Sequence, residues 1–312
     1  MKAIAIDSFG GKEKLILTQL PKPQPLKDEI LIRVAGAGVN PVDYKIREGY
    51  LKDMFPHRFP VVLGWDVSGT VVDKGNDVKN FNVGDKVMAY ARKSEVSAGT
   101  YAEFVTVSGN AAAPVPDTIA LSDAAAIPLA ALTAWQALQD FAQIKKGMTV
   151  LVHAGAGGVG SYAIQFAKLA GAYVLTTASA HNHEYVKDLG ADRVIDYKAS
   201  NFRSSLSEKV DIVLDCVGGD VLTESFEVIK RGGVLVSIVG VPDEDLAKKF
   251  EIRTGWIFVE PNGIQLAEIA DLIQARKLKL PKVKSLPLEE AAYAHEISES
   301  RHAIGKLVLT LH

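Results

Sequence analysis

Short apolar runs separated by polar turns characterise the first third of the chain. Glycine, proline and asparagine bound these runs, which cover residues 30–35, 69–72, 84–90 and 101–107. Such spacing is typical of antiparallel strands that are joined by tight turns. The pattern therefore predicts a compact, β-rich domain at this end of the chain.

The pattern of apolar positions changes near residue 120. Residues 122–138 are rich in alanine and predict a helix that Pro128 breaks or kinks. From residue 147 onward, apolar runs alternate with helical segments. The runs cover residues 149–153, 172–177, 193–196, 211–215, 234–238 and 256–259. Six apolar strands joined by helices predict a parallel, doubly wound sheet in an α/β domain.

The C-terminal part of the chain changes character again. Helices are predicted for residues 263–275 and 288–299, and a final strand for residues 306–310. Because this strand lies outside the alternation of strands and helices, we expect it to return to the first domain. The expected organisation is a β-rich domain of residues 1–120 and 263–312, with a dinucleotide-binding domain of residues 121–262 inserted in it.

Composition and charge narrow the class of protein. Hydrophobic residues make up 48% of the 312 residues and the formal net charge is −2, so we expect a soluble enzyme without the basic excess that binds nucleic acid. Cys216 is the single cysteine, which rules out an internal disulfide and fits a reducing compartment. The first apolar run is too short for a signal peptide, and none reaches the roughly 18 residues of a membrane span. A cytoplasmic enzyme with no membrane partner is therefore expected.

A glycine-rich segment directly follows the predicted strand at 149–153. Its sequence, Gly155-Ala156-Gly157-Gly158-Val159-Gly160, matches the pattern G-x-G-x-x-G and opens an amphipathic helix. Glycine here allows a tight turn, close approach of the backbone to a pyrophosphate, and close packing of helix on strand. The helix N-terminus adds its positive dipole end. The segment therefore predicts that the chain binds a dinucleotide cofactor.

The next predicted strand lacks the acidic residue that usually selects NAD by binding the ribose hydroxyls. It is followed by Ser179, His181 and Asn182, and the first carboxylate is that of Glu184. A carboxylate would repel a 2′-phosphate, whereas Ser179 and Asn182 can donate hydrogen bonds to one. The sequence therefore favours NADPH. Ser179 could also cap the helix that follows it.

Five stretches together make the chain resemble the medium-chain dehydrogenase/reductase family over essentially its full length. They are residues 38–43 (GVNPVD), 63–69 (LGWDVSG), 83–87 (VGDKV), 132–135 (LTAW) and 154–160 (AGAGGVG). The resemblance implies a GroES-like catalytic domain that holds an inserted Rossmann domain, with the active site between the two. The chain is most similar to the quinone oxidoreductase branch and, around residues 40–49, to plant alkenal and enone reductases.

The resemblance also bears on metal binding. The zinc-dependent alcohol dehydrogenases of this family place a cysteine ligand where this chain has Asn40, a histidine ligand where it has Trp65, and a third ligand near Leu129. Their structural loop with four cysteines has no counterpart here. Zinc needs nitrogen, sulfur or oxygen ligands that converge in a tetrahedron. We therefore expect no metal site.

The resemblance implies roles for residues outside the glycine-rich segment. Thr133 is expected to face the carboxamide of the nicotinamide ring. Ser179, Tyr197 and Arg301 match positions that surround the 2′-phosphate, and Val239 is expected to contact the cofactor as well. Together with the glycine-rich segment and Asn182, these residues form the expected cofactor site.

The expected reaction follows from the missing metal. Without zinc, no Lewis acid activates an alcohol for oxidation, whereas an enone or a quinone is already electrophilic. The resemblance places Asn40 beside the nicotinamide and the substrate, where its amide can donate a hydrogen bond to the developing enolate oxygen. Tyr44 and Lys45 are candidate proton donors or oxygen clamps, and solvent could deliver the proton instead. The expected activity is NADPH-dependent reduction of a quinone or of the C=C bond of an α,β-unsaturated carbonyl.

Two other functions stay open from the sequence. One is a noncatalytic NADPH-binding protein, since relatives serve as a lens crystallin or bind RNA, although the near-neutral charge argues against nucleic acid. The other is an alcohol dehydrogenase. The apolar run at 256–259 looks like an edge strand that a second copy of the chain could extend, so a homodimer is expected.

Overall fold

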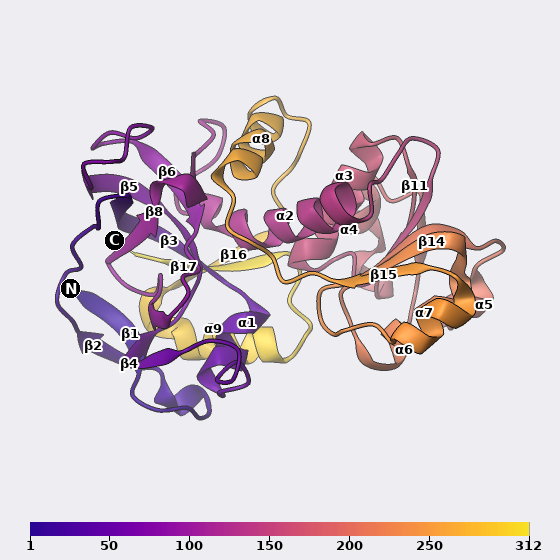
Figure 1. Cartoon of the computed structure of the whole chain (residues 1–312), viewed down its shortest axis with the longest axis horizontal. Helices are drawn as coiled ribbons and strands as arrows, with labels where there is room; N and C mark the ends of the chain where they lie inside the picture. Colours follow the sequence, from indigo (N-terminus) through magenta and orange to yellow (C-terminus); the bar gives the residue numbers. More distant parts are fainter. Residues whose placement is uncertain (312) are drawn as a thin grey trace. The chain divides into compact units, whose positions relative to one another are not determined.

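The computed structural model describes residues 1–311 and divides into two compact units (Figure 1). One unit comprises Met1–Leu129 together with the chain from Pro261 onward, and the other comprises Ala130–Glu260. Within the described residues, no helix is both long and apolar enough to cross a membrane.

Two β-sheets form the first unit. Its larger, seven-stranded sheet has the order β16 (Val283–Pro287), β17 (Lys306–Thr310), β3 (Glu29–Val39), β5 (Asp66–Lys74), β6 (Lys86–Tyr90) and β9 (Ala112–Pro114), with β8 (Phe104–Ser108) also paired to β3. Its smaller sheet has the order β2 (Ile16–Gln19), β1 (Lys2–Ile6), β4 (His57–Val62) and β7 (Val96–Ala98). The final strand β17 pairs antiparallel with β3, so the C-terminal part of the sequence joins the sheet of the first domain.

Strand β3 carries the chain to the candidate site. The short helix η3 (Asp123–Ala126) packs on it so closely that a Cβ at Gly36 would lie 2.2 Å from the carbonyl oxygen of Ser122. A Cβ at Gly38 would lie 2.3 Å from the carbonyl oxygen of Ala125. Only glycine fits such contacts. Immediately after β3 the chain turns at Asn40 into helix α1 (Pro41–Arg47), and the other helices of this unit are α8 (Gly263–Gln274) and α9 (Ala291–Glu299).

The second unit is built on a six-stranded parallel sheet. Its order is β12 (Arg193–Ile195), β11 (Tyr173–Thr177), β10 (Thr149–Val152), β13 (Val210–Asp215), β14 (Ile229–Ser237) and β15 (Arg253–Trp256). The connecting helices are α3 (Gly158–Leu169), α4 (His183–Asp188), α5 (Phe202–Ser205), α6 (Gly219–Ser225) and α7 (Glu244–Phe250). This is the strand order of a dinucleotide-binding Rossmann fold. The predicted fold class, a GroES-like unit with an inserted Rossmann unit, is confirmed.

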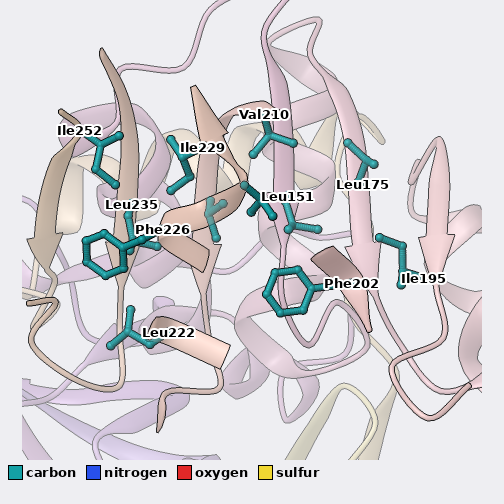
Figure 2. Packing of buried hydrophobic residues seen from close by; sticks show 12 residues of the cluster. Leu151, Leu175, Ile195, Phe202, Val210, Leu222, Phe226, Ile229, Leu235 and Ile252 are labelled. Carbon is teal, nitrogen blue, oxygen red and sulfur yellow. The ribbon is translucent and has the colours of Figure 1, made fainter. Parts of the chain in front are cut away.

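One face of the Rossmann sheet is covered by the helices of its second half. Figure 2 shows Leu151, Leu175 and Ile195 on neighbouring strands, and Phe202 and Phe226 from α5 and the turn after α6. These residues belong to one buried apolar cluster. Since each fully buried apolar side chain contributes about 1.5–3 kcal/mol, this layer holds the sheet and helices α5, α6 and α7 together.

Two predicted elements differ from the observed ones. Pro128 interrupts the segment 122–138, but as the first residue of helix α2 (Pro128–Trp135), where its missing N–H is harmless. The edge strand expected at 256–259 lies three residues earlier, at Arg253–Trp256. There a Cβ at Gly255 would come within 2.3 Å of the Phe141 ring, so this strand needs glycine at position 255. Glycine is uncommon in strands, which is why the sequence pattern did not predict this one. Pairing of this edge with a second copy stays a prediction.

His153 follows β10 and is buried in the second unit. Its ring nitrogens lie 3.3 Å from Thr177 Oγ1 and 3.2 Å from Ser225 Oγ. Burial lowers the pKa of His153 from 6.5 to about 4, and the nearby Asp215 carboxylate opposes this only in part. A neutral imidazole is therefore part of the folded state.

We expect His153 to make the protein less stable in acid. Between pH 6.5 and 4 the unfolded chain binds a proton at this residue and the folded chain does not, so stability falls with pH across that window, by about 3 kcal/mol at its lower end. Urea unfolding at several pH values measures the free energy of unfolding of the natural protein and of His153→Gln, and the advantage of the natural protein should fall by this amount as the pH is lowered. The exposed His181 provides the matched control, because the difference between the natural protein and His181→Gln should not change in this way.

Comparing the natural protein with His153→Gln also separates the effect of His153 on stability from that of Asp43. Burial raises the pKa of Asp43 to about 7, so this carboxyl makes stability fall as pH rises toward 7, the opposite direction. Burial and the Arg47 charge lower the pKa of a second histidine, His295, to about 3, so His295 also destabilises the protein in acid. Asp43 and His295 are present in both proteins, and their contributions cancel in the difference. A difference in free energy of unfolding that stays constant from pH 7 to pH 4 would contradict the prediction.

Candidate active site

The glycine-rich loop of the second unit lies between β10 and α3. The Gly155 N–H donates to the carbonyl oxygen of Thr177 at 3.0 Å, which ties the loop to β11. A Cβ at Gly155 would lie 2.0 Å from Thr176 Oγ1, and a Cβ at Gly160 would lie 2.3 Å from the carbonyl oxygen of Ala154. Ala154 itself adopts the left-handed conformation, with φ of 55°, which is strained for a residue with a side chain.

Helix α3 begins at Gly158 and spans twelve residues, with Val159 and Gly160 in its first turn. The N–H groups of such a turn have no partner inside the helix and attract anions. The loop from Gly155 to Gly160 therefore fits the pyrophosphate of a dinucleotide, because its glycines leave no side chain between the backbone and a ligand.

Further candidate cofactor residues follow the carboxyl ends of neighbouring strands. Ser179 and Asn182 follow β11, Tyr197 follows β12, and Val239 follows β14. Parallel strands present their carboxyl ends at one edge of the sheet, where doubly wound folds bind their ligands. Helix α3 follows β10, which lies beside β11 in the sheet, so its start lies at this same edge.

Ser179 and Asn182 interact with each other. Asn182 Nδ2 donates to Ser179 Oγ at 3.3 Å, and His181 Nε2 lies 3.4 Å from the same oxygen. The Ser179 side chain makes no capping hydrogen bond to the turn that follows, so the alternative of a capping serine is wrong. Tyr197 is half-exposed and Val239 is 38% exposed. Thr133, by contrast, is buried in helix α2.

In the first unit, Asn40 is buried and held on both sides of its amide. Its Nδ2 donates to Asp66 Oδ2 at 2.8 Å, and its Oδ1 accepts from Lys306 Nζ at 2.5 Å. Its backbone N–H donates to Asp43 Oδ2 at 2.8 Å. An amide nitrogen carries two hydrogens, so the amide has one N–H left for another acceptor.

A row of hydrogen-bonded, buried polar side chains runs from Asp43 through Tyr101 and His295 to Arg47. Tyr101 donates to Asp43 Oδ2 at 2.9 Å, Tyr101 Oη lies 3.3 Å from His295 Nε2, and His295 Nδ1 lies 3.1 Å from Arg47 Nη1. Arginine can only donate, so His295 accepts at Nδ1 and donates from Nε2 to Tyr101. Burial and the Arg47 charge lower the pKa of His295 to about 3. Every hydrogen bond of the row therefore points toward Asp43.

Sequence reasoning did not single out Asp66, Lys306 or this row as site residues. Asp66 lies in one of the five family-like stretches, and Lys306 opens an apolar strand. The signal for His295 is its place on α9, where it shares the buried face with Ala291 and Ala294. A polar residue on an apolar helix face is unusual enough to mark a buried network.

The other candidates of the first unit lie near one another. Tyr44 is buried and Lys45 is half-buried on helix α1. Burial and the charge of Arg301 lower the pKa of Lys45. Arg301 is exposed and adopts the left-handed conformation, with φ of 57°, just after α9. The structure thus brings together Lys45, a candidate proton donor, and Arg301, a candidate phosphate-binding residue, closely enough for their charges to interact.

The residues at the zinc-ligand positions of the zinc-dependent relatives do not fit a zinc ion. Asn40 accepts from an ammonium group, Trp65 packs its ring edge-on against two neighbouring aromatic rings, and Leu129 offers its backbone N–H, which donates to Asp66 Oδ1 at 2.7 Å. Lys306 already places a positive charge beside Asn40 and Asp66. Residues 1–311 hold no cluster of three or more His, Cys, Asp or Glu side chains able to bind a metal.

Comparison with known proteins identifies the family. Residues 26–117 match the alcohol dehydrogenase GroES-like domain, and residues 189–309 match the zinc-binding dehydrogenase family. The chain is 34% identical to the chloroplast envelope quinone oxidoreductase homolog of Arabidopsis thaliana, over 99% of this chain and 98% of that protein. It is 35% identical to the chloroplastic NADPH-dependent alkenal/one oxidoreductase of the same plant, over 99% of this chain and 79% of that protein.

A solved structure extends the similarity to the fold. The quinone oxidoreductase from Coxiella burnetii superposes with a TM-score of 0.92 at 39% identity, over 100% of this chain and 99% of that one. Similarity at this level covers both units. The chain therefore belongs to the medium-chain dehydrogenase/reductase family, in the branch that contains the quinone oxidoreductases.

Proposed function

We propose that this enzyme uses NADPH to reduce quinones or the C=C bond of α,β-unsaturated carbonyls. The observation that carries the proposal is the buried Asn40 amide, which has one N–H to spare, contacts Lys306, and stands where the resemblance places a metal ligand of the zinc-dependent relatives. The names of the similar proteins, quinone oxidoreductase and alkenal/one oxidoreductase, supply the class of substrate.

Our proposal for the cofactor is NADPH rather than NADH. Several features of the Rossmann unit support it: the glycine-rich loop fits a pyrophosphate, Ser179 and Asn182 stand without a carboxylate where the ribose is expected, and Tyr197 follows the next strand. Bound NADPH would supply a hydride from its nicotinamide ring.

The residues of this chain would stabilise charge and move a proton. In our proposal the free N–H of Asn40 donates to the substrate oxygen that gains negative charge. Lys45 is our candidate for the proton donor, because burial and the Arg301 charge lower the pKa of its ammonium, which makes it a stronger acid than an exposed lysine. Tyr44 and solvent are the alternatives.

Zinc has no part in this proposal. The positions of its ligands are filled by an amide, an indole and an aliphatic side chain, with an ammonium beside them. Oxidation of a simple alcohol needs an alkoxide, which at neutral pH calls for a metal or a strong base. Neither group is offered by Asn40, Trp65 or Leu129, so we do not favour an alcohol dehydrogenase.

A labelling experiment tests the proposed reaction. Enones, enals and quinones are incubated with NADPH deuterated at the transferred position, in the presence of a chelator. We expect NADPH consumption and, by mass spectrometry, deuterium on the β-carbon of the reduced enone, with no NADP⁺ reduction by ordinary primary or secondary alcohols. Deuterium on a carbinol carbon or ready turnover of alcohols would overturn the proposal. Tight NADPH binding without turnover of any substrate would favour the noncatalytic alternative.

A further inference from the structure

A buried lysine and a buried aspartate bracket the amide of Asn40. Lys306 Nζ lies 2.5 Å from Asn40 Oδ1, 3.2 Å from the carbonyl oxygen of Val39 and 3.3 Å from Asp66 Oδ2. These three acceptors use all three donors of the ammonium. Lys306 is 4% exposed and Asp66 is fully buried, so neither charge is screened by bulk water.

The two charges allow the Asn40 amide only one orientation. With its oxygen toward Lys306 and its nitrogen toward Asp66, both contacts join a donor to an acceptor. A half-turn of the amide would set its NH₂ group against the ammonium and its oxygen against the carboxylate. Both reversed contacts are repulsive in a medium of low dielectric constant, where electrostatic interactions are strong.

Backbone groups hold both members of the pair in place. Asp66 Oδ1 accepts the N–H of Leu129 at 2.7 Å, and Lys306 is anchored on the Val39 carbonyl oxygen. Strand pairing adds to this, because β17 and β5 both pair with β3, the strand that leads into Asn40. Buried ion pairs add little net stability, so a gain in stability does not explain why Lys306 and Asp66 are held in this arrangement.

We propose that Lys306 and Asp66 are positioning residues, which fix the Asn40 amide so that a single N–H points to the substrate oxygen. The inference rests on the function proposed above for Asn40. It adds that this donor is set in advance by a pair of opposite charges, so that substrate binding does not have to order the amide.

Kinetic measurements on four variants, and on Lys306→Met combined with Asn40→Ala, test the proposal. Lys306→Met removes the ammonium, and Lys306→Met/Asp66→Asn removes both charges while keeping an acceptor for the Leu129 N–H. In the double variant the amide introduced at position 66 would favour the reversed orientation of Asn40. Lys93→Met is the matched control, because Lys93 makes a similar ion pair with Glu29 at 2.6 Å, at the opposite end of β3. Asn40→Ala completes the set.

We expect Lys306→Met and the double variant to lower kcat for enone reduction by about tenfold or more, with KM and the affinity for NADPH changed by less than about threefold. Lys93→Met should keep kcat. In an Asn40→Ala background, Lys306→Met should lower kcat by no more than about twofold further, because both changes remove the same interaction. Losses that multiply in the combined variant, or full activity of the two Lys306 variants, would overturn the inference.

Nuclear magnetic resonance tests the inference without any destabilising change. In natural protein labelled with ¹⁵N-asparagine, the side-chain signals of Asn40 are assigned by their loss in Asn40→Ala. One amide proton, bound to Asp66, should be protected from exchange, and the other should respond to added substrate or product. Equal exchange of both protons would show that the amide is not fixed. If Asn40→Ala keeps full activity, the proposed function of Asn40 fails; if Asn40→Ala loses activity and Lys306→Met does not, only this inference fails.

Discussion

Replacing Asn40 by alanine is expected to lower kcat for enone reduction by about 10²–10³-fold, the loss that follows removal of one oxyanion-hole donor. The substitution removes the single N–H that Lys306 and Asp66 leave unused. The donor acts on charge that appears only in the transition state, so KM should change little. Steady-state kinetics with an enone and saturating NADPH measures the effect.

Asn80→Ala is a suitable control for this experiment. Asn80 Nδ2 donates to the carbonyl oxygen of Gly109 at 3.1 Å in the same unit, far along the chain from Asn40. Its loss should leave kcat within about twofold of the natural protein. A variant Asn40→Ala that keeps kcat, or that loses NADPH binding to the same extent as kcat, would show that the amide does not stabilise the reacting oxygen.

Replacing Ser179 by aspartate is expected to weaken NADPH binding by about 1–3 kcal/mol, a factor of roughly 5–150 in Kd. The new carboxylate would repel a 2′-phosphate, and the hydroxyl next to Asn182 would be lost. Binding of NADH should stay the same or tighten, because a carboxylate suits free ribose hydroxyls. Fluorescence titration of both cofactors measures the change.

Ser207→Asp adds the same charge at an exposed bend just before β13, at the amino end of that strand. It should leave both affinities unchanged, which separates a local effect at Ser179 from a general effect of net charge. Equal affinity of the natural protein for NADPH and NADH would count against Ser179 as the residue that selects the cofactor.

The sequence was most informative where local chemistry and local structure coincide. The segment from Gly155 to Gly160 needs glycine for backbone reasons that hold in any protein with this turn, so its place between β10 and α3 could be predicted. Five of the six strands of the Rossmann unit were predictable because parallel strands are buried on both faces and leave continuous apolar runs. For the edge strand the same reasoning failed, since Arg253 and Gly255 do not look like strand residues.

The surroundings of Asn40 could not be predicted, because they depend on contacts between distant parts of the chain. Asn40 and Asp66 are separated by 26 positions, and Asn40 and Lys306 by 266. Asn40 could be singled out from its own segment, but nothing near Asp66 or Lys306 in the sequence points to Asn40. The pairing of β3 with β5 and β17 brings the three residues together. Asp66 occupies one N–H of the Asn40 amide, and the other stays available for the single hydrogen bond that was expected.

The row of hydrogen bonds from Arg47 through His295 and Tyr101 to Asp43 also limits how protons can travel. A proton wire has to reverse all its donors and acceptors in turn, and this row ends on a guanidinium, which does not give up its proton. The row can polarise the Asp43 carboxyl, but it cannot feed protons from the protein surface to Asn40. Protons consumed in turnover therefore have to arrive by a different route, from the side of Lys45 and Tyr44 or directly from water.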